Sequence, residues 1–272
     1  MRRNRDSVRS DRERFEEALT TRRLGRTLRW HQEIPSTNDA ARVWADAGAP
    51  AGALIFANHQ SKGRGRHGRD WVVEPGLNLT VSLVLRPRIP ASRFGLVTLA
   101  AGLAVREAIE ACCAGAGARI KWPNDILIEE KKCCGMLLES AIGRVPEESF
   151  IVLGIGVNVN QDAFPGPFER STTSVMLGCG RPIDRMRLLA DLLNRLEKKL
   201  DRLESSPDAI VREYEGAIEG IGEAFRLTDV SSGDVHVGIM RGIDPTGGLV
   251  LEIGSLRQVF HAGDVEKVVR AK

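Results

Sequence analysis

Apolar and polar residues alternate along this chain with two different periods, and each period predicts a kind of element. Between Phe94 and Ala111 the apolar positions Leu96, Leu99 and Leu103 recur at intervals of three and four, which predicts a buried helix. Similar spacing, with capping and breaking residues at the ends, predicts four further helices: Asp11 to Arg23, Ser36 or Thr37 to near Gly48, Arg185 to Leu203, and Asp208 to about Glu219.

The second period is two, which is typical of strands. Leu77 to Leu83 alternates between apolar and polar residues and predicts a strand. Short apolar runs bounded by polar turns predict five more strands: Ala53 to Ala57, Arg119 to Lys121, Ile126 to Ile128, Met136 to Glu139, and Phe150 to Val159. Because strands and helices follow one another along the chain, we expect an α/β fold with a mixed sheet backed by helices.

The pattern changes after Gly222 to short strands separated by turns. The turns are expected at Ser231–Asp234, Asp244–Gly248 and Gly254–Ser255, so this part predicts a small all-β domain. We therefore divide the chain into a basic segment over residues 1–23, a larger domain over 24–221 and a small domain over 222–272, joined by a short linker near Gly220 to Glu223.

Composition and charge exclude several classes of protein. Hydrophobic residues make up 42% and charged residues 28%, which are ordinary values for a soluble globular protein. No apolar run approaches the ~18 residues of a membrane span, and no apolar stretch follows the basic start as a secretory signal requires. We expect a cytoplasmic protein with no membrane partner.

The basic balance is a local feature of the N-terminus. The first thirty residues hold ten arginines against five acids, while the whole chain has a net charge of only +3. Since the acids are interleaved with the arginines at helical spacing, we predict a solvated helix or tail here and no DNA partner.

The cysteines form no recognisable framework. Cys112 adjoins Cys113, Cys133 adjoins Cys134, and Cys179 stands alone. This is neither the spacing of a disulfide scaffold nor that of a zinc site, so we predict reduced thiols.

Three segments carry candidate chemistry. Gly63-Arg64-Gly65-Arg66-His67-Gly68-Arg69 combines glycines, which allow close backbone approach, with guanidinium groups that bind anions, so phosphate is its candidate ligand. It lacks the Gly-Lys-Ser/Thr of a Walker loop and the glycine spacing of a Rossmann fingerprint, and by itself it is equally compatible with a solvated loop.

In the second segment, Lys121-Trp122-Pro123-Asn124-Asp125, a lysine stands on a rigid, partly apolar support and could neutralise charge on a carboxylate or phosphate. Alternatively, Trp122 is a core residue and Lys121 reaches solvent from a turn. The third segment, Gly154 to Val159, ends an apolar strand with small residues and Asn158.

Together and in this order, the motifs resemble those of the biotin protein ligases, also called biotin–acetyl-CoA-carboxylase ligases or holocarboxylase synthetases. The resemblance covers about residues 24 to 270 and includes Gly135-Met136-Leu137. It implies a catalytic α/β domain similar to class II aminoacyl-tRNA synthetases, followed by a small SH3-like barrel.

The resemblance also implies roles for individual residues. Lys121 and Arg66 would be catalytic, and Arg66, Trp71, Asn124 and Asn158 would bind the nucleotide. Biotin and adenylate would be bound by Ser36, Thr37, Asn38, Gln60, Gly63, Arg64, Gly65, Arg66, Lys121 and Gly135. The chain departs from the family at His67, which fills a variable position, and at Cys133-Cys134, where an apolar residue and alanine are more common.

The activity implied is a two-step reaction. Biotin and ATP, with Mg²⁺ bridging the phosphates, would form biotinyl-5′-AMP, and a lysine of a biotin carboxyl carrier protein would then take the biotin. Homodimers are common in the family. Only about 35 residues precede Ser36, too few for the winged helix domain of repressor members, so we expect a ligase without repressor function.

Two alternatives remain at this point. A lipoate or octanoate ligase shares the fold and the acyl-adenylate chemistry but lacks the paired Gly-Arg-Gly-Arg and Lys-Trp-Pro-Asn motifs. A basic nucleic-acid-binding protein would show binding that falls steeply with salt, and no ATP turnover.

Overall fold

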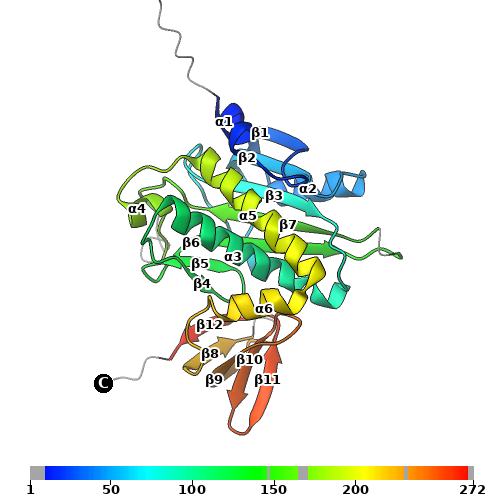
Figure 1. The fold of residues 1–272 in the computed structure, drawn as a ribbon. Coiled ribbons are helices and arrows are strands. Elements are labelled where there is room, and N and C mark those ends of the chain that lie inside the picture. The colour runs from blue at the N-terminus through cyan, green and yellow to red at the C-terminus, as the bar shows by residue number, and fades with distance from the viewer. Residues whose placement is uncertain (1–9, 146–147, 165–170, 230–231, 269–272) are drawn as a thin grey trace, which may run out of the picture.

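The computed structural model describes residues 10–145, 148–164, 171–229 and 232–268 (Figure 1). Its helices are α1 (Asp11–Ala18), α2 (Thr37–Asp46), α3 (Gly95–Cys112), α4 (Val175–Cys179), α5 (Arg185–Ser205) and α6 (Pro207–Glu215), with single 3-10 turns η1 (Arg66–Gly68) and η2 (Ala91–Arg93). Its strands are β1 (Leu28–Ile34), β2 (Leu54–Gln60), β3 (Leu79–Leu85), β4 (Arg119–Lys121), β5 (Asp125–Ile128), β6 (Lys131–Ala141), β7 (Phe150–Val157), β8 (Ala224–Thr228), β9 (Val235–Ile243), β10 (Leu249–Ile253), β11 (Leu256–Phe260) and β12 (Asp264–Lys267).

Parts of three predictions lie outside the described residues: the first nine residues of the basic segment, Ser231 of a predicted turn, and the last four residues of the predicted small domain.

Two sheets organise the chain. The large sheet has the order β1-β2-β3-β7-β6-β5-β4, and within it only β1 and β2 run parallel. Helices α3 and α5 cover one face (Figure 1), and α2 packs against β2, β3 and β7 on the other, where Ala41 and Ala45 meet Ile55 and Val84. The predicted mixed sheet backed by helices is confirmed.

Helix α3 lies at the centre of the core, as its spacing predicts. Its apolar residues are buried between the large sheet and α5. Gly102 of this helix faces Met136 and Tyr214, each of which would lie 3.7 Å from an added Cβ.

The first helix is shorter than predicted, because it ends at Ala18 and does not reach Arg23. At this end, Asn194 of α5 accepts from the N–H of Thr20 at 2.8 Å and donates to the Ala18 carbonyl at 3.1 Å. Further along, the Glu197 carboxylate accepts hydrogen bonds from the backbone N–H groups of Arg22, Arg23 and Leu24 at 2.7, 2.8 and 3.1 Å. These donors would otherwise continue the helix. Asn194 and Glu197 of α5 thus hold this segment in a non-helical conformation, and helical spacing alone does not reveal such distant partners.

Two strands differ from the pattern. The sequence did not predict β1, a half-exposed edge strand with several polar side chains. Its parallel pairing with β2 holds it in the extended conformation. Strand β6 begins at Lys131, five residues before the predicted start at Met136, because it pairs with β5 as well as β7. Tertiary pairing extends strands beyond their local signal.

The small sheet has the order β11-β10-β9-β8-β12 and is antiparallel throughout. It lies below the helical layer, next to α6 (Figure 1). Trp122 Nε1 donates to the carbonyl of Gly247 at 3.1 Å, and Glu215 accepts from the N–H of Ile243 at 2.8 Å. The predicted all-β segment is present. The domain boundary near residue 221 stays a prediction, and it is compatible with the start of β8 at Ala224.

A disulfide joins Cys113, just after α3, to Cys179 at the end of α4, with the Cα atoms 5.6 Å apart. The prediction of reduced thiols is therefore wrong for this pair, while Cys112, Cys133 and Cys134 are free. The two partners are 66 residues apart in the sequence, so only the fold shows that they meet. Among the described residues, no helix is long and apolar enough to cross a membrane.

Replacing Glu197 with glutamine should lower the free energy of unfolding at pH 7 by about 1–3 kcal/mol, because a charged acceptor of backbone donors is lost. Burial disfavours the charged form of Glu197, but the backbone donors outweigh it and lower the pKa. The stabilisation is thus present above the unfolded pKa of roughly 4.3 and lost as pH falls through the folded pKa.

Urea unfolding of wild type and E197Q between pH 3 and 7 measures this. The difference should shrink below about pH 4. E16Q, which removes only a surface ion pair with Arg12, is the control and should change stability by less than about 0.5 kcal/mol. An E197Q defect that is the same at pH 3 and pH 7 would contradict the charge-based explanation.

The thiol count provides a second test of the fold. The denatured but unreduced protein should react with a thiol reagent at three cysteines, and at five after reduction. Five reactive thiols before reduction would show that Cys113 and Cys179 are not joined.

Candidate active site

Two neighbouring cavities collect most of the predicted site residues. The large cavity, of about 630 Å³, lies between the two sheets, and its walls include Gly65, Arg66, Trp71, Lys121, Asn124 and Asn158. The small cavity, of about 50 Å³, lies over the large sheet and is lined by Ser36, Thr37, Asn38, Gln60, Arg64, Gly65, Arg66, Trp71, Asn124 and Gly135.

The start of α2 forms the floor of the small cavity. Ser36 caps the helix, its side chain accepting from the N–H of Asp39. Thr37 donates both its backbone N–H and its hydroxyl to Gln60 Oε1, at 2.7 and 2.8 Å. The capping signal in the sequence thus places the polar Ser-Thr-Asn corner against the end of β2.

Asn38 is held on every side. Its amide nitrogen donates to Glu139 at 2.7 Å, and Ser82 Oγ lies 2.6 Å from its amide oxygen. A Cβ at Gly154 would lie 2.2 Å from that same oxygen, so only glycine leaves room for it. Ser82 is fully buried in β3 and also lies 2.8 Å from the Thr37 hydroxyl.

The glycine-arginine loop folds back on itself. The backbone of Trp71 donates to the carbonyl of Gly63 at 3.0 Å, and that of Gly65 donates to Arg69 at 2.7 Å. A Cβ at Gly63 would lie 2.4 Å from the Trp71 carbonyl oxygen, which explains this glycine. Gly63 lines neither cavity, unlike the other predicted site residues.

Each arginine of the loop contacts a different part of the protein. Arg64 pairs with Asp39 of α2 at 2.5 Å and lies 3.4 Å from Glu139. Arg66 donates to Asn124 Oδ1 at 2.8 Å, and Arg69 pairs with Asp264 of the small sheet. The loop is thereby attached to α2, to the turn before β5 and to β12.

The large cavity is lined by charged side chains of both signs, among them Arg66, Lys121, Asp125 and Asp264. Burial lowers the pKa of Arg66, against the opposing effect of Asp125 and Asp264, but a guanidinium remains charged. Burial disfavours ionisation of Asp264 as well, yet Arg69, Lys121 and Arg66 outweigh this and lower its pKa. The site therefore holds buried positive charge next to ionised carboxylates.

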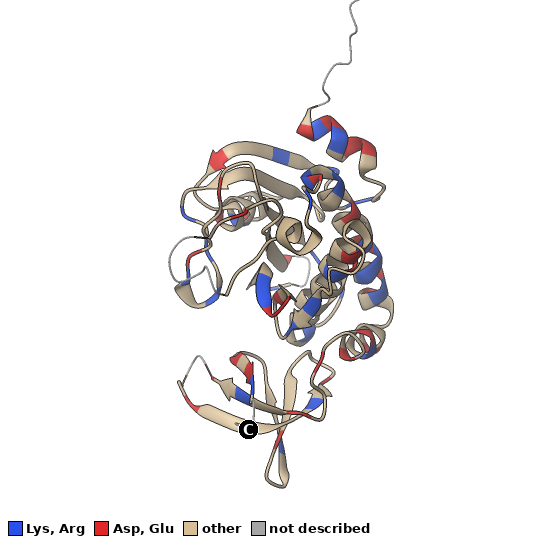
Figure 2. Cartoon of the chain, turned by 90° about the vertical axis from the view of Figure 1, so that its left-hand side faces the viewer, with Lys and Arg blue, Asp and Glu red and all other residues tan. Residues whose placement is uncertain are grey.

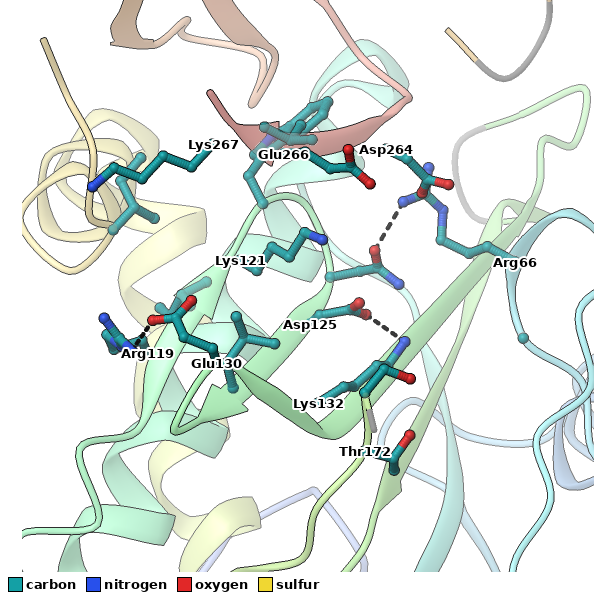
Figure 3. Close-up of a pocket in the computed structure, with 18 of the residues that line it drawn as sticks. Arg66, Arg119, Lys121, Asp125, Glu130, Lys132, Thr172, Asp264, Glu266 and Lys267 are labelled. Carbon is teal, nitrogen blue, oxygen red and sulfur yellow. Dashed lines mark hydrogen bonds and ion pairs between the residues drawn. The ribbon is translucent and has the colours of Figure 1, made fainter. Parts of the chain in front are cut away.

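Lys121 ends β4 and extends into the large cavity toward the side where Arg66 enters (Figure 3). Trp122, beside it, is buried, so the part of the alternative that made Trp122 a core residue is correct. Lys132, which also lines the large cavity, pairs with Asp125 at 2.7 Å. The amide nitrogen of Asn124 donates to the Met136 carbonyl at 2.8 Å, which turns its oxygen toward Arg66.

Trp71 separates the two cavities. A Cβ at Gly156 would lie 2.5 Å from its indole ring and one at Gly135 3.2 Å, so these glycines form a flat surface beneath it. Lys132 Nζ lies 5.7 Å from the ring centre. Among the described residues, the indole N–H has no hydrogen-bond partner although it is buried.

Asn158 is buried just after β7. Its amide nitrogen donates to Thr173 at 3.1 Å, its backbone N–H donates to Cys133 at 2.8 Å, and its carbonyl accepts from Val175 at 2.9 Å. It therefore positions the segment of Ser171 and Thr172 that walls the large cavity.

Sequence reasoning missed several polar groups of the site. Ser82 and Glu139 hold the floor of the small cavity, while Lys132 and Asp264 border the large one. Ser82 had a signal, a polar residue inside a strand whose side chains are buried throughout. Asp264 had none, because its role depends on where the small sheet lies.

Comparisons with known proteins match both parts of the chain. The profile of the "Biotin/lipoate A/B protein ligase family" matches residues 30–158, and that of the "Biotin protein ligase C terminal domain" matches residues 220–268. A biotin–[acetyl-CoA-carboxylase] ligase of Mycobacterium tuberculosis is 34% identical over 260 residues, covering 92% of this chain and 94% of that relative. A bifunctional ligase/repressor BirA of Bacillus subtilis is 35% identical over 251 residues, covering 91% of this chain and 76% of that relative.

Among solved structures, a biotin protein ligase from Aquifex aeolicus in complex with biotin and ATP superposes with a TM-score of 0.77. The two sequences are 25% identical, and the match covers 89% of this chain and 100% of that one.

The contact between Gly154 and Asn38 provides a test of the small cavity. G154A should lower the thermal unfolding midpoint by about 2–8 °C, because the new methyl group displaces the Asn38 amide from Ser82 and Glu139. G65A is the matched control, since the nearest atom to its Cβ, the carbonyl oxygen of Arg69, would lie 3.4 Å away. Equal midpoints for G154A and wild type would show that Asn38 is not confined as described.

Proposed function

The chain belongs to the biotin protein ligase family, and we propose that this ligase forms biotinyl-5′-AMP from biotin and ATP and transfers biotin to a lysine of a biotin carboxyl carrier protein. The observation that carries the proposal is the meeting of the two cavities at Arg66 and Asn124. One cavity would hold the acid and the other the nucleotide, so their reacting groups would meet beside Arg66 and Lys121.

We assign biotin to the small cavity. Its ureido ring offers two N–H donors and one carbonyl acceptor, and the floor offers the Thr37 hydroxyl together with the amides of Asn38 and Gln60. At about 50 Å³ the cavity is smaller than the bicyclic ring system, so the indole of Trp71, which lines both cavities, has to shift on binding.

We assign ATP to the large cavity, with Arg66, Trp71, Asn124 and Asn158 as its contacts. The biotin carboxylate attacks the α-phosphorus, an O–P bond forms, and pyrophosphate leaves with the electrons of the broken bond. Lys121 and Arg66 offset the negative charge that accumulates between the two anions. One such donor, already oriented and desolvated, is worth about 10²–10³ in rate.

Magnesium fits this site only as a companion of the nucleotide. Among the described residues, no group of three or more His, Cys, Asp or Glu side chains could hold a metal ion. Mg²⁺ is commonly held by one or two carboxylates and by substrate phosphates, and Asp125 and Asp264 face the cavity. When bound, the ion would neutralise charge on the triphosphate.

In the second step the acceptor lysine replaces AMP, so the enzyme needs no nucleophile of its own. The enzyme has to protect the mixed anhydride from water until then. The loop of residues 63–71 is suited to this, because Arg64, Arg66 and Arg69 attach it on three sides.

The partner follows from the named relatives, whose substrate is acetyl-CoA carboxylase, and we propose its biotin carboxyl carrier protein as the acceptor. Homodimerisation, a cytoplasmic location and the lack of a DNA partner stay predictions. In the view of Figure 2, Lys and Arg alternate with Asp and Glu along the helices. The lipoate alternative finds no support in the named relatives.

Biotin-dependent ATP–pyrophosphate exchange tests the first step. Wild type should catalyse exchange with biotin and not with lipoate, and K121A should reduce it by about 100-fold, because a cation beside the reacting oxygens is lost. The control K198A alters a helix lysine outside both cavities. No exchange, or exchange with lipoate alone, would rule out the proposed function.

The loop has a separate prediction. R66A should release more biotinyl-AMP and its hydrolysis products per turnover than wild type, because the contact with Asn124 that holds the loop is gone. Quenched reactions without carrier measure the released adenylate. Release equal to wild type would mean that Arg66 does not retain the intermediate.

A further inference from the structure

A third cavity, of about 350 Å³, also reaches the catalytic centre. Its walls come from four places: Ser92 and Thr98 around the start of α3, Pro123, Leu138 of β6, and Thr246 and His261 of the small sheet. Arg66 and Asn124 line this cavity as well as the large and small ones. All three cavities therefore meet at one pair of side chains.

A two-step ligase has to bring three reactants to one point: an acid, a nucleotide and an amine. On the proposed function, the small and large cavities account for the first two. We propose that the third cavity admits the side chain of the acceptor lysine, so that its amine reaches the acyl-adenylate beside Arg66 and Asn124. This assignment rests on the proposed function, since it needs an adenylate to be present.

The walls suit a neutral amine. The third cavity has hydroxyl groups at Ser92, Thr98 and Thr246, and no carboxylate among its lining residues. Its permanent charge is the guanidinium of Arg66, and a nearby like charge disfavours the ammonium form of a lysine. The arrangement thus favours the deprotonated amine, which is the form that can attack.

The chemical step balances with these groups alone. The lysine nitrogen attacks the carbonyl carbon of the biotinyl-adenylate, a C–N bond forms, and the C–O bond to the phosphate breaks. AMP leaves with that electron pair, and the nitrogen loses one proton to solvent. Water reaches the cavity at its mouth, where Ser92, Gly95 and His261 are exposed.

The small sheet gains a specific role. Its turn at Thr246 is fixed by Asp244, which accepts hydrogen bonds from the backbone of Thr246 and Gly248 at 3.0 and 2.7 Å. The turn is joined to the large sheet where Trp122 Nε1 donates to the Gly247 carbonyl at 3.1 Å. One wall of the amine's path is thus built by the C-terminal part of the chain.

Two variants that obstruct this cavity test the assignment. S92W places a large side chain at the exposed mouth, and T98F fills the interior. The matched control is S255W, the same substitution in an exposed turn of the small sheet that lines none of the three cavities. Two rates are measured for each protein: biotin-dependent ATP–pyrophosphate exchange, and single-turnover transfer from enzyme-bound biotinyl-AMP to a biotin carboxyl carrier domain.

We expect S92W and T98F to keep exchange within about twofold of wild type and to slow transfer by about tenfold or more, because they block only the amine. S255W should change neither rate. Unchanged transfer in S92W would overturn the assignment, and so would a parallel loss of exchange, which would make the cavity part of the adenylation step, for instance as the place of pyrophosphate. If wild type itself shows no exchange, the proposed function fails instead.

Discussion

The large sheet is covered on both faces, and this constraint shapes the rest of the molecule. Helices α3 and α5 bury one face and α2 the other, so every side chain of β3 is buried. A polar side chain in such a place has to find partners inside the protein. Ser82 finds Thr37 and Asn38, and that small network becomes the floor of the cavity assigned to biotin.

Glycines give the site its depth. Gly154 leaves room for the Asn38 amide, and Gly135 and Gly156 together form the flat surface under Trp71. Side chains at these points of β6 and β7 would fill the space in which a ligand has to lie. The strands thus provide both the rigid support of the site and its hollow, while α2 provides its polar groups.

The arginine loop connects parts of the chain that are far apart in sequence. Arg64 contacts α2, Arg66 contacts the turn before β5, and Arg69 contacts β12 of the small sheet. A loop attached in this way covers the junction of the cavities. Its position depends on each of these three contacts. The small sheet therefore contributes to the candidate site through Asp264, as well as through the wall of the third cavity at Thr246.

The sequence by itself determined the elements with strong local signals: the buried helix α3, the start of α2 at Ser36 or Thr37, the central strands and the motifs at Arg66 and Lys121. These follow from periodicity, capping and side-chain chemistry, which act between neighbours in the chain. Only the tertiary structure decided where α1 ends, that β1 is a strand, that Cys113 meets Cys179, and that Asp264 reaches Arg69. Each of these depends on groups brought together from distant positions, and periodicity carries no information about which distant groups will meet.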